Sequence, residues 1–181
     1  MTAKPRKIAI WTLVAILVAL TAVTGKLFQE MLKKDIAFLI LDTEARDSAV
    51  IAWAARRVLD TVRPTEADVD QLNGDAGARH IALIRDPDLA EGLFRRFIAQ
   101  GLDLDARDAS GRWTALQMVL IDNNPAAART LIRLGARFDL RDGEGRDLRT
   151  IVAQLQERLP DQDYGAVIAL LQDEMKDQPS R

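Results

Sequence analysis

The chain has 181 residues, enough for one domain of ordinary size and an additional segment. It contains no Cys and a single His, which excludes disulfide bonds, thiolate metal sites and metal sites built from several His. Hydrophobic residues make up 48% of the chain, so it can bury a core. From Lys26 onward, 22 basic residues stand against 27 acidic ones without a basic stripe, which argues against nucleic acid as a partner.

The segment 8–24 contains no charged residue and follows a short stretch rich in Lys and Arg. Its 17 residues correspond to about 26 Å of helix, close to the thickness of a bilayer core. We expect residues 1–25 to form a cytoplasmic tail and a transmembrane signal anchor. The best pair of small residues for signal cleavage, Ala22 and Thr24, is weak and favours retention. A cleaved signal peptide and a buried helix of a soluble protein remain as alternatives.

The distribution of basic residues bears on orientation. Three precede the apolar segment, and Lys26, Lys33 and Lys34 follow it, so the counts nearly balance. A basic tail before an apolar segment matches an ordinary secretory start, and Arg outnumbers Lys 19 to 6, as is usual for GC-rich bacterial genomes. We expect a single-pass inner-membrane protein with its body in the periplasm; the alternatives are a cytoplasmic body and secretion after signal cleavage.

Residues 26–74 are predicted to form a helical stalk and N-terminal capping helices. The first helix is expected to continue to about Leu41, where an interfacial or partner-binding stretch is the alternative to a packed stalk. A second helix is expected to begin at Asp42 or Thr43 and to end near Val62, before Pro64. Its predicted apolar face consists of Ala45, Ala49, Ala52, Trp53, Val58, Leu59 and Val62.

Two stretches in the second half of the chain repeat one another. One begins at Gly101 and reads GLDLDARDASG; the other begins at Gly135 and reads GARFDLRDGEG. Both match G-x-x-x-D-x-R-D-x-x-G at an offset of 34 residues, and each follows an apolar helical stretch. A period of this length is typical of stacked repeat proteins.

The stretch 108–142 resembles an ankyrin repeat. Its Thr114-Ala115-Leu116-Gln117 stands where that family has Thr-Pro-Leu-His, and Arg112-Trp113 inserts one residue before it. A preceding unit has His80 at the Thr position, and a following unit has Asp147 there. The resemblance implies a short ankyrin-like α-solenoid of about three helix-pair repeats over residues 75–178, with a tail at 179–181. Together with the N-terminal transmembrane helix and the helical stalk, this predicts an all-α fold.

Within this register, glycine and proline positions predict where helices end and begin. Gly101 and Gly135 are expected to adopt the left-handed conformation that ends each outer helix. Asn123 and Asn124 are expected to form a turn, after which Pro125 begins the next helix. The acidic, Arg-rich phrases after each glycine, 103–111 and 139–145, are expected to form hairpin-like tips.

Evidence for catalysis is thin. His80 has no motif nearby that supplies a nucleophile or an orienting partner. The carboxylates of the two tips alternate with Arg and do not match a calcium-binding loop, which favours salt-bridged tips. We expect no catalytic residue, metal, cofactor or small-molecule substrate. Trp113, beside a tip, is either packed under it or an exposed anchor for a partner.

The resemblance implies protein–protein recognition through the inner helices and the tips. The predicted function is a non-catalytic, membrane-tethered binding module in the cell envelope, acting as a scaffold or accessory subunit of a membrane complex or as a protective, immunity-type protein. Alternatives are a soluble periplasmic binding protein, a small enzyme with His80 in its site, and a span that itself pairs with other helices through small residues. The predicted protein-binding residues are Arg107, Asp108, Arg112, Trp113, Gln117, Arg141, Asp142 and Arg146.

Overall fold

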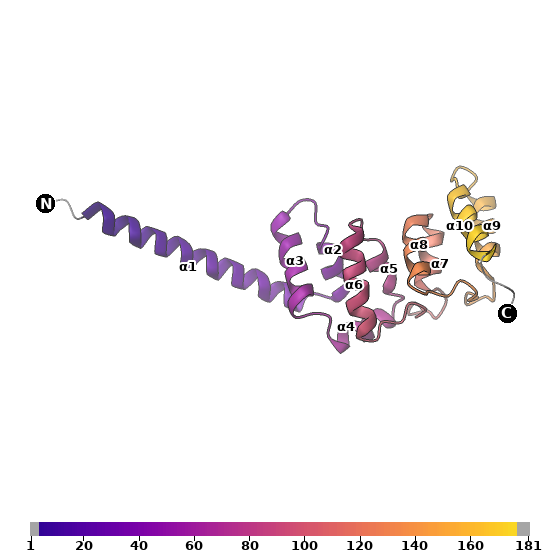
Figure 1. The fold of residues 1–181 in the computed structure, drawn as a ribbon, viewed down its shortest axis with the longest axis horizontal. Coiled ribbons are helices and arrows are strands. Elements are labelled where there is room, and N and C mark those ends of the chain that lie inside the picture. The colour runs from indigo at the N-terminus through magenta and orange to yellow at the C-terminus, as the bar shows by residue number, and fades with distance from the viewer. Residues whose placement is uncertain (1–3, 177–181) are drawn as a thin grey trace. The chain divides into compact units, whose positions relative to one another are not determined.

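The computed structural model describes the backbone of residues 4–176 and the side chains of residues 11–173. Within that range the chain forms ten α-helices and no strand (Figure 1), which confirms the all-α prediction. Two compact units are present, residues 1–63 and residues 64–181. The boundary between them lies one helix earlier than the predicted one at residue 74. The predicted tail 179–181 lies outside the described residues.

The first unit begins with α1 (Lys4–Lys33). Residues 11–33 of this helix are long and apolar enough to span a membrane or to form part of a signal sequence. Residues 11–26 are exposed, whereas Met31 near the C-terminal end is buried. The helix does not continue to Leu41 as expected. The Asp35 carboxylate accepts a hydrogen bond from the Ala37 amide at 2.9 Å and starts a separate helix, α2 (Ile36–Asp42), because an N-cap side chain satisfies the free amides of a new helix.

The next helix of this unit, α3 (Ala49–Thr61), begins later than the sequence suggested. The Thr43 hydroxyl donates to the Ile40 carbonyl at the end of α2, and Ser48 caps α3 instead, by accepting from the Ile51 amide at 3.3 Å. Trp53 and Val62 are each 53% exposed and Ala49 is exposed as well, although we expected all three on the apolar face. The buried face of α3, which packs near α1 and α2, consists of Ala54, Ala55, Val58 and Leu59.

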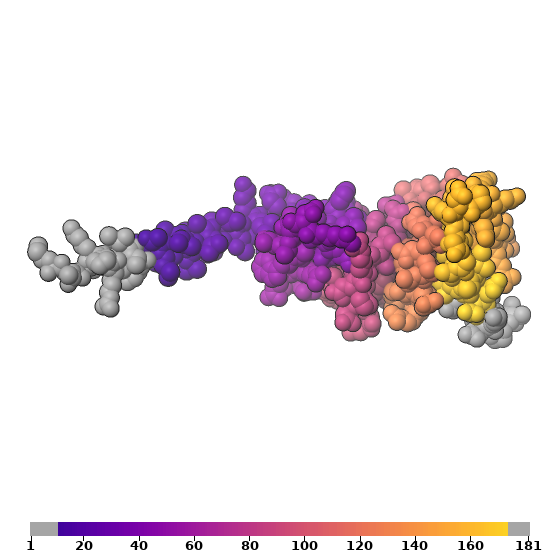
Figure 2. Space-filling view, turned by 90° about the horizontal axis from the view of Figure 1, so that it is seen from above, coloured from indigo at the N-terminus to yellow at the C-terminus, as the bar shows by residue number. Residues whose placement is uncertain are grey.

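The second unit contains three consecutive helix pairs, preceded by one further helix. Within this unit the pairs lie side by side in chain order (Figure 1), and Figure 2 shows the same order in its pink, orange and yellow surfaces. The first helix of the middle pair contacts the first helices of both neighbouring pairs. The helices are α4 (Glu66–Asn73), α5 (Ala78–Ala82), α6 (Pro87–Ala99), α7 (Ala115–Ile121), α8 (Pro125–Arg133), α9 (Leu148–Arg158) and α10 (Gly165–Lys176).

All three pairs contribute buried apolar side chains. Tyr164 is also buried, and its hydroxyl donates to the Ile121 carbonyl at 3.2 Å, which ties the third pair to the second. One helix pair cannot bury its apolar surface alone, so each pair depends on its neighbours for stability. The core residues include Leu93, Phe94, Phe97, Leu116, Leu120, Leu131, Ile151 and Val167.

Identical glycine turns end α6 and α8. Gly101 and Gly135 have φ angles of +100° and +102°, which confirms their predicted left-handed conformation. In each turn the next amide donates back into the helix, from Leu102 to the Phe97 carbonyl and from Ala136 to the Leu131 carbonyl. These bonds satisfy carbonyl groups that a helix end leaves free. The 34-residue sequence period therefore corresponds to a repeated local geometry.

Candidate functional site

The first tip, predicted over residues 103–111, extends to residue 113 in the structure and is a turn organised by Asp108. One carboxylate oxygen of Asp108 accepts hydrogen bonds from the Ser110 hydroxyl and the Arg112 amide, both at 2.8 Å. The Gly111 amide donates to the Asp108 carbonyl at 2.7 Å, and Gly111 has a φ of +71°, which favours glycine at this position. Asp108 thus fixes the loop on which Arg112 and the following residue are displayed.

The second tip, predicted over residues 139–145, extends to residue 146 and has the same construction. An Asp142 oxygen accepts from the Glu144 amide at 2.9 Å and from the Arg146 amide at 2.8 Å. Gly145, with a φ of +78°, donates to the Asp142 carbonyl at 3.0 Å. The two phrases that repeat in the sequence therefore fold into equivalent turns.

Two arginines at equivalent positions brace these turns. Arg107 donates through Nη1 to the Arg112 carbonyl at 3.0 Å and through Nη2 to the Arg141 carbonyl of the second tip at 2.6 Å. Arg141 in turn donates to the Gly145 carbonyl at 2.7 Å. Arg107 therefore links the tips to each other, whereas Arg141 braces its own tip and remains exposed.

Two of the predicted binding residues lie beneath the surface. Gln117 is 1% exposed: its Oε1 accepts from the Thr114 amide at 2.9 Å, and its Nε2 donates to the Leu140 carbonyl at 3.1 Å. The Asp142 side chain is buried as well and binds Arg146. Both residues shape the tips. We expected their side chains to reach solvent, but they do not, because their polar atoms are the partners of buried backbone and guanidinium groups.

Trp113 lies where the two tips meet. In the first tip the Asp108 amide donates to the Trp113 carbonyl, and in the second tip the Asp142 amide donates to the Arg146 carbonyl. Trp113 is therefore equivalent to Arg146, in a turn that is one residue longer. The guanidinium carbons of Arg112 and Arg146 both lie over the Trp113 ring, 5.6 Å from its centroid. At this distance a guanidinium is attracted to the electron-rich face of indole.

Glu144 completes this arrangement; it is one of the tip carboxylates for which we predicted salt bridges, but we did not count it among the binding residues. Its carboxylate pairs with Arg112 and, at 3.1 Å, with Arg146. Arg146 also pairs with Asp142 at 2.7 Å. We call the group Arg112, Trp113, Glu144 and Arg146 the tip cluster. It is half-buried to exposed, bonded within itself and composed of side chains from both tips.

Hydrogen bonds keep the tip aspartates ionised. Burial alone would raise the pKa of Asp108, but donors from the Arg112 amide and the Ser110 hydroxyl hold it below its ordinary value. Burial likewise opposes ionisation of Asp142, and the backbone amide and guanidinium of Arg146 outweigh it, so this pKa is lowered too. Both turns therefore depend on negative charge at their aspartate.

The domain is expected to lose stability in acid. The pKa of Asp147, which caps α9, is also lowered, because its carboxylate accepts from the Thr150 amide. A carboxyl whose pKa is lower in the folded chain stabilises it above the unfolded pKa of about 3.9 and loses that effect as the pH falls through the folded value. The urea midpoint should be flat from about pH 7 to 5 and fall below about pH 4.

Asp147→Asn is the matched variant for this effect. Asn is as good an N-cap as Asp, so α9 should persist at neutral pH, and the variant should lose less stability in acid than the parent chain. Urea unfolding followed by circular dichroism measures both. An unchanged acid slope in the variant would show that Asp147 does not contribute.

The remaining sequence candidates are His80 and the other carboxylates of the tips. His80 lies half-buried as the third residue of α5, and not before the helix as its assignment to the Thr position predicted, because Gly77 is the N-cap of α5. Among the described residues, no group of three or more His, Asp or Glu side chains could hold a metal ion. The Asp105 carboxylate accepts from the Arg137 amide at 2.8 Å, and Asp139 pairs with the Arg137 guanidinium, so these tip carboxylates act within the repeat structure.

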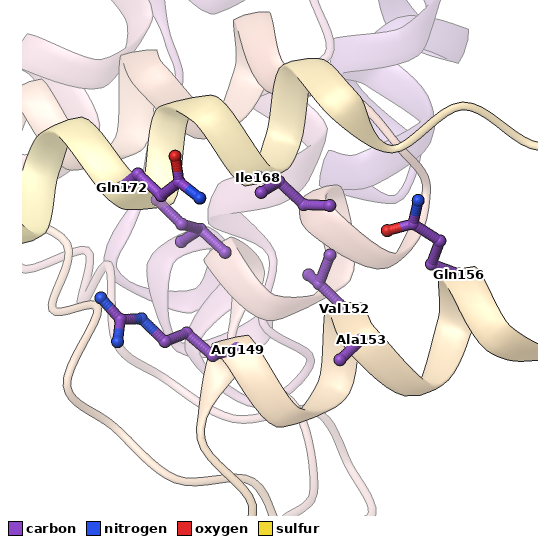
Figure 3. A pocket seen from close by; sticks show the side chains of 7 residues that line it. Arg149, Val152, Ala153, Gln156, Ile168 and Gln172 are labelled. Atoms are coloured by element: carbon purple, nitrogen blue, oxygen red, sulfur yellow. The ribbon is translucent and has the colours of Figure 1, made fainter.

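A groove of about 350 Å³ lies between α9 and α10, a feature that the sequence did not suggest. Figure 3 shows polar side chains at its two ends and apolar ones between them. Of the lining residues only Arg149 is charged, so the groove has no pair of groups suited to acid–base chemistry. It is lined by Arg149, Val152, Ala153, Gln156, Ile168, Leu171 and Gln172.

Comparisons of the chain with protein-family models, with curated proteins and with solved structures find no match. The geometry of α1 and of the two tips therefore carries the functional conclusion.

Proposed function

We propose that the chain is a non-catalytic, membrane-tethered module that binds a protein partner through its tip cluster. We further propose that the second unit is an ankyrin-type stack. The support for this arrangement is local and repeated: helix pairs in chain order, glycine turns 34 residues apart, and two tips with equivalent hydrogen bonds. Stacks of this kind offer extended surfaces to partners.

The tip cluster is the observation that carries the proposal. Trp and Arg are the residues that most often dominate binding energy at protein interfaces. Here Trp113 and its two arginines are held in place by ion pairs to Glu144 and Asp142 before any partner arrives. Such ordering reduces the entropy lost on binding. The binding surface of this proposal is Arg112, Trp113, Arg141, Glu144 and Arg146, with Arg107, Asp108, Gln117 and Asp142 supporting it.

The apolar part of α1 supports the tether. It is exposed along its length, as expected for a helix that contacts lipid, and we propose that it remains in the inner membrane with the second unit in the periplasm. A tethered module meets membrane partners at a raised effective concentration. This suits an accessory subunit or scaffold of an envelope complex, or a protein that blocks a toxic partner outside the cytoplasm.

Site-specific photocrosslinking tests the binding surface. A photoreactive residue replaces the exposed Arg141 in the full chain, expressed in its native cells. We expect one protein adduct of discrete mass, and Trp113→Ala should lower its yield by about 30-fold, which corresponds to a loss of about 2 kcal/mol. Arg129→Ala, on the exposed side of α8, is the matched control and should leave the yield unchanged.

Equal adduct yields from the parent chain and from Trp113→Ala would contradict recognition through the tip cluster. Circular dichroism of both variants verifies that each remains folded. Because Trp113 is only half-buried, its replacement should leave the helix content intact.

A further inference from the structure

An apolar face of α3 is left open to solvent within the first unit. Val50 is 61% exposed and Trp53 is 53% exposed, and residues three apart lie on the same side of a helix. Both lie away from the buried face that holds Ala54 and Val58. Large apolar side chains that cluster on one exposed face indicate contact with something other than water.

A ring contact fixes the level of Trp53 along α1. The Trp53 ring packs edge-on against Phe28, with ring centroids 6.2 Å apart and an angle of 69° between the planes. Phe28 is four residues beyond Thr24, the last residue of the uncharged segment, a rise of about 6 Å along the helix. Lys26 lies between them. Trp53 is therefore at the height where an apolar span gives way to charged residues.

A second contact places α3 at the same end of α1. Arg63, just beyond the end of α3, donates to the Leu32 carbonyl at 3.2 Å, one turn farther along α1 than Phe28. Both contacts place α3 beside the last turns of α1, beyond the uncharged segment. Figure 1 shows α3 running across the end of α1 rather than along it.

We propose that α3 lies on the surface of the bilayer that α1 spans, with Val50 and Trp53 in the boundary between headgroups and acyl chains. Trp is enriched at this depth because its ring is apolar and its N–H remains near water. Arg57, exposed one turn beyond Trp53 on the same face, is placed to meet lipid phosphates. This inference rests on the proposed membrane span and adds a second, interfacial contact with the same leaflet.

The absence of Cys from the chain allows a direct test by single-cysteine variants of the full chain. Val50→Cys probes the exposed face of α3, and Leu17→Cys probes the span. Ala99→Cys, at an exposed position of the second unit, is the accessible control. Each is reconstituted into vesicles of phosphatidylethanolamine and phosphatidylglycerol and treated with a membrane-impermeant maleimide. Reaction rates are divided by those of the same variant unfolded in urea.

We expect Val50→Cys to react about tenfold more slowly than Ala99→Cys, the protection given when the docked arrangement is favoured by about 1.4 kcal/mol. Residues 50 and 99 follow the same span, so mixed insertion in the vesicles affects both alike. If Leu17→Cys is protected and Val50→Cys reacts as fast as Ala99→Cys, the span stands and interfacial docking of α3 is wrong. If Leu17→Cys also reacts freely, the proposed span and this inference both fail.

Discussion

Phe94→Ala is expected to lower the free energy of unfolding of the second unit by about 3–5 kcal/mol, because it empties a fully buried site in α6. Domains of this size have only about 5–15 kcal/mol of stability, so much of it should be lost. Ile98→Ala, on the same helix but partly exposed, is the matched control and should cost about 1 kcal/mol or less.

Hydrogen exchange of the same variant shows how far the loss spreads. If the three pairs share one core, Phe94→Ala should reduce amide protection in α10 as well as in α6, since each pair depends on its neighbours. Loss confined to α5 and α6 would contradict a continuous stack. Both experiments use the full chain in detergent.

Asp142→Ala is the second change with a large expected effect, about 3 kcal/mol. It removes a buried carboxylate that accepts from two backbone amides of its tip and from the Arg146 guanidinium, and leaves those donors without a partner. Asp139→Ala breaks an Asp–Arg pair of the same chemistry at the surface and should cost about 1 kcal/mol or less.

The two pairs differ in exposure and in their backbone bonds: the Asp142 side chain is 1% exposed and accepts from two amides, whereas that of Asp139 is 61% exposed and pairs with Arg137. Urea unfolding of both variants measures the difference. Equal losses would show that the buried pair does not organise the second tip. The crosslinking yield from position 141 should also fall in Asp142→Ala, because Arg146 loses the partner that holds it over Trp113.

Local sequence signals predicted much of the second unit correctly. The glycine ends at Gly101 and Gly135 and the start of α8 at Pro125 each depend on a few adjacent residues. Short-range chemistry of this kind is readable in the chain because the donor, the acceptor and the required backbone angle lie within one turn.

Long-range contacts account for most of what the sequence did not reveal. Glu144 and Arg112 are 32 residues apart, so their pairing appears only once the tips are side by side. Gln117 is polar, so we expected it at the surface. Its burial depends on a hydrogen bond to the Leu140 carbonyl 23 residues away. In the first unit, the face of α3 that is buried near α1 and α2 does not include Trp53, which is 53% exposed.

Location and retention of the chain test the central claim of a membrane-tethered module most directly. A reporter that is active only in the periplasm is fused after Arg181, and membranes are fractionated and washed with alkaline carbonate. The account predicts an active reporter on a full-length product that stays in the membrane pellet. A soluble, shortened product would show that the apolar segment is a cleaved signal, and an inactive reporter would place the second unit in the cytoplasm; either result would contradict the account.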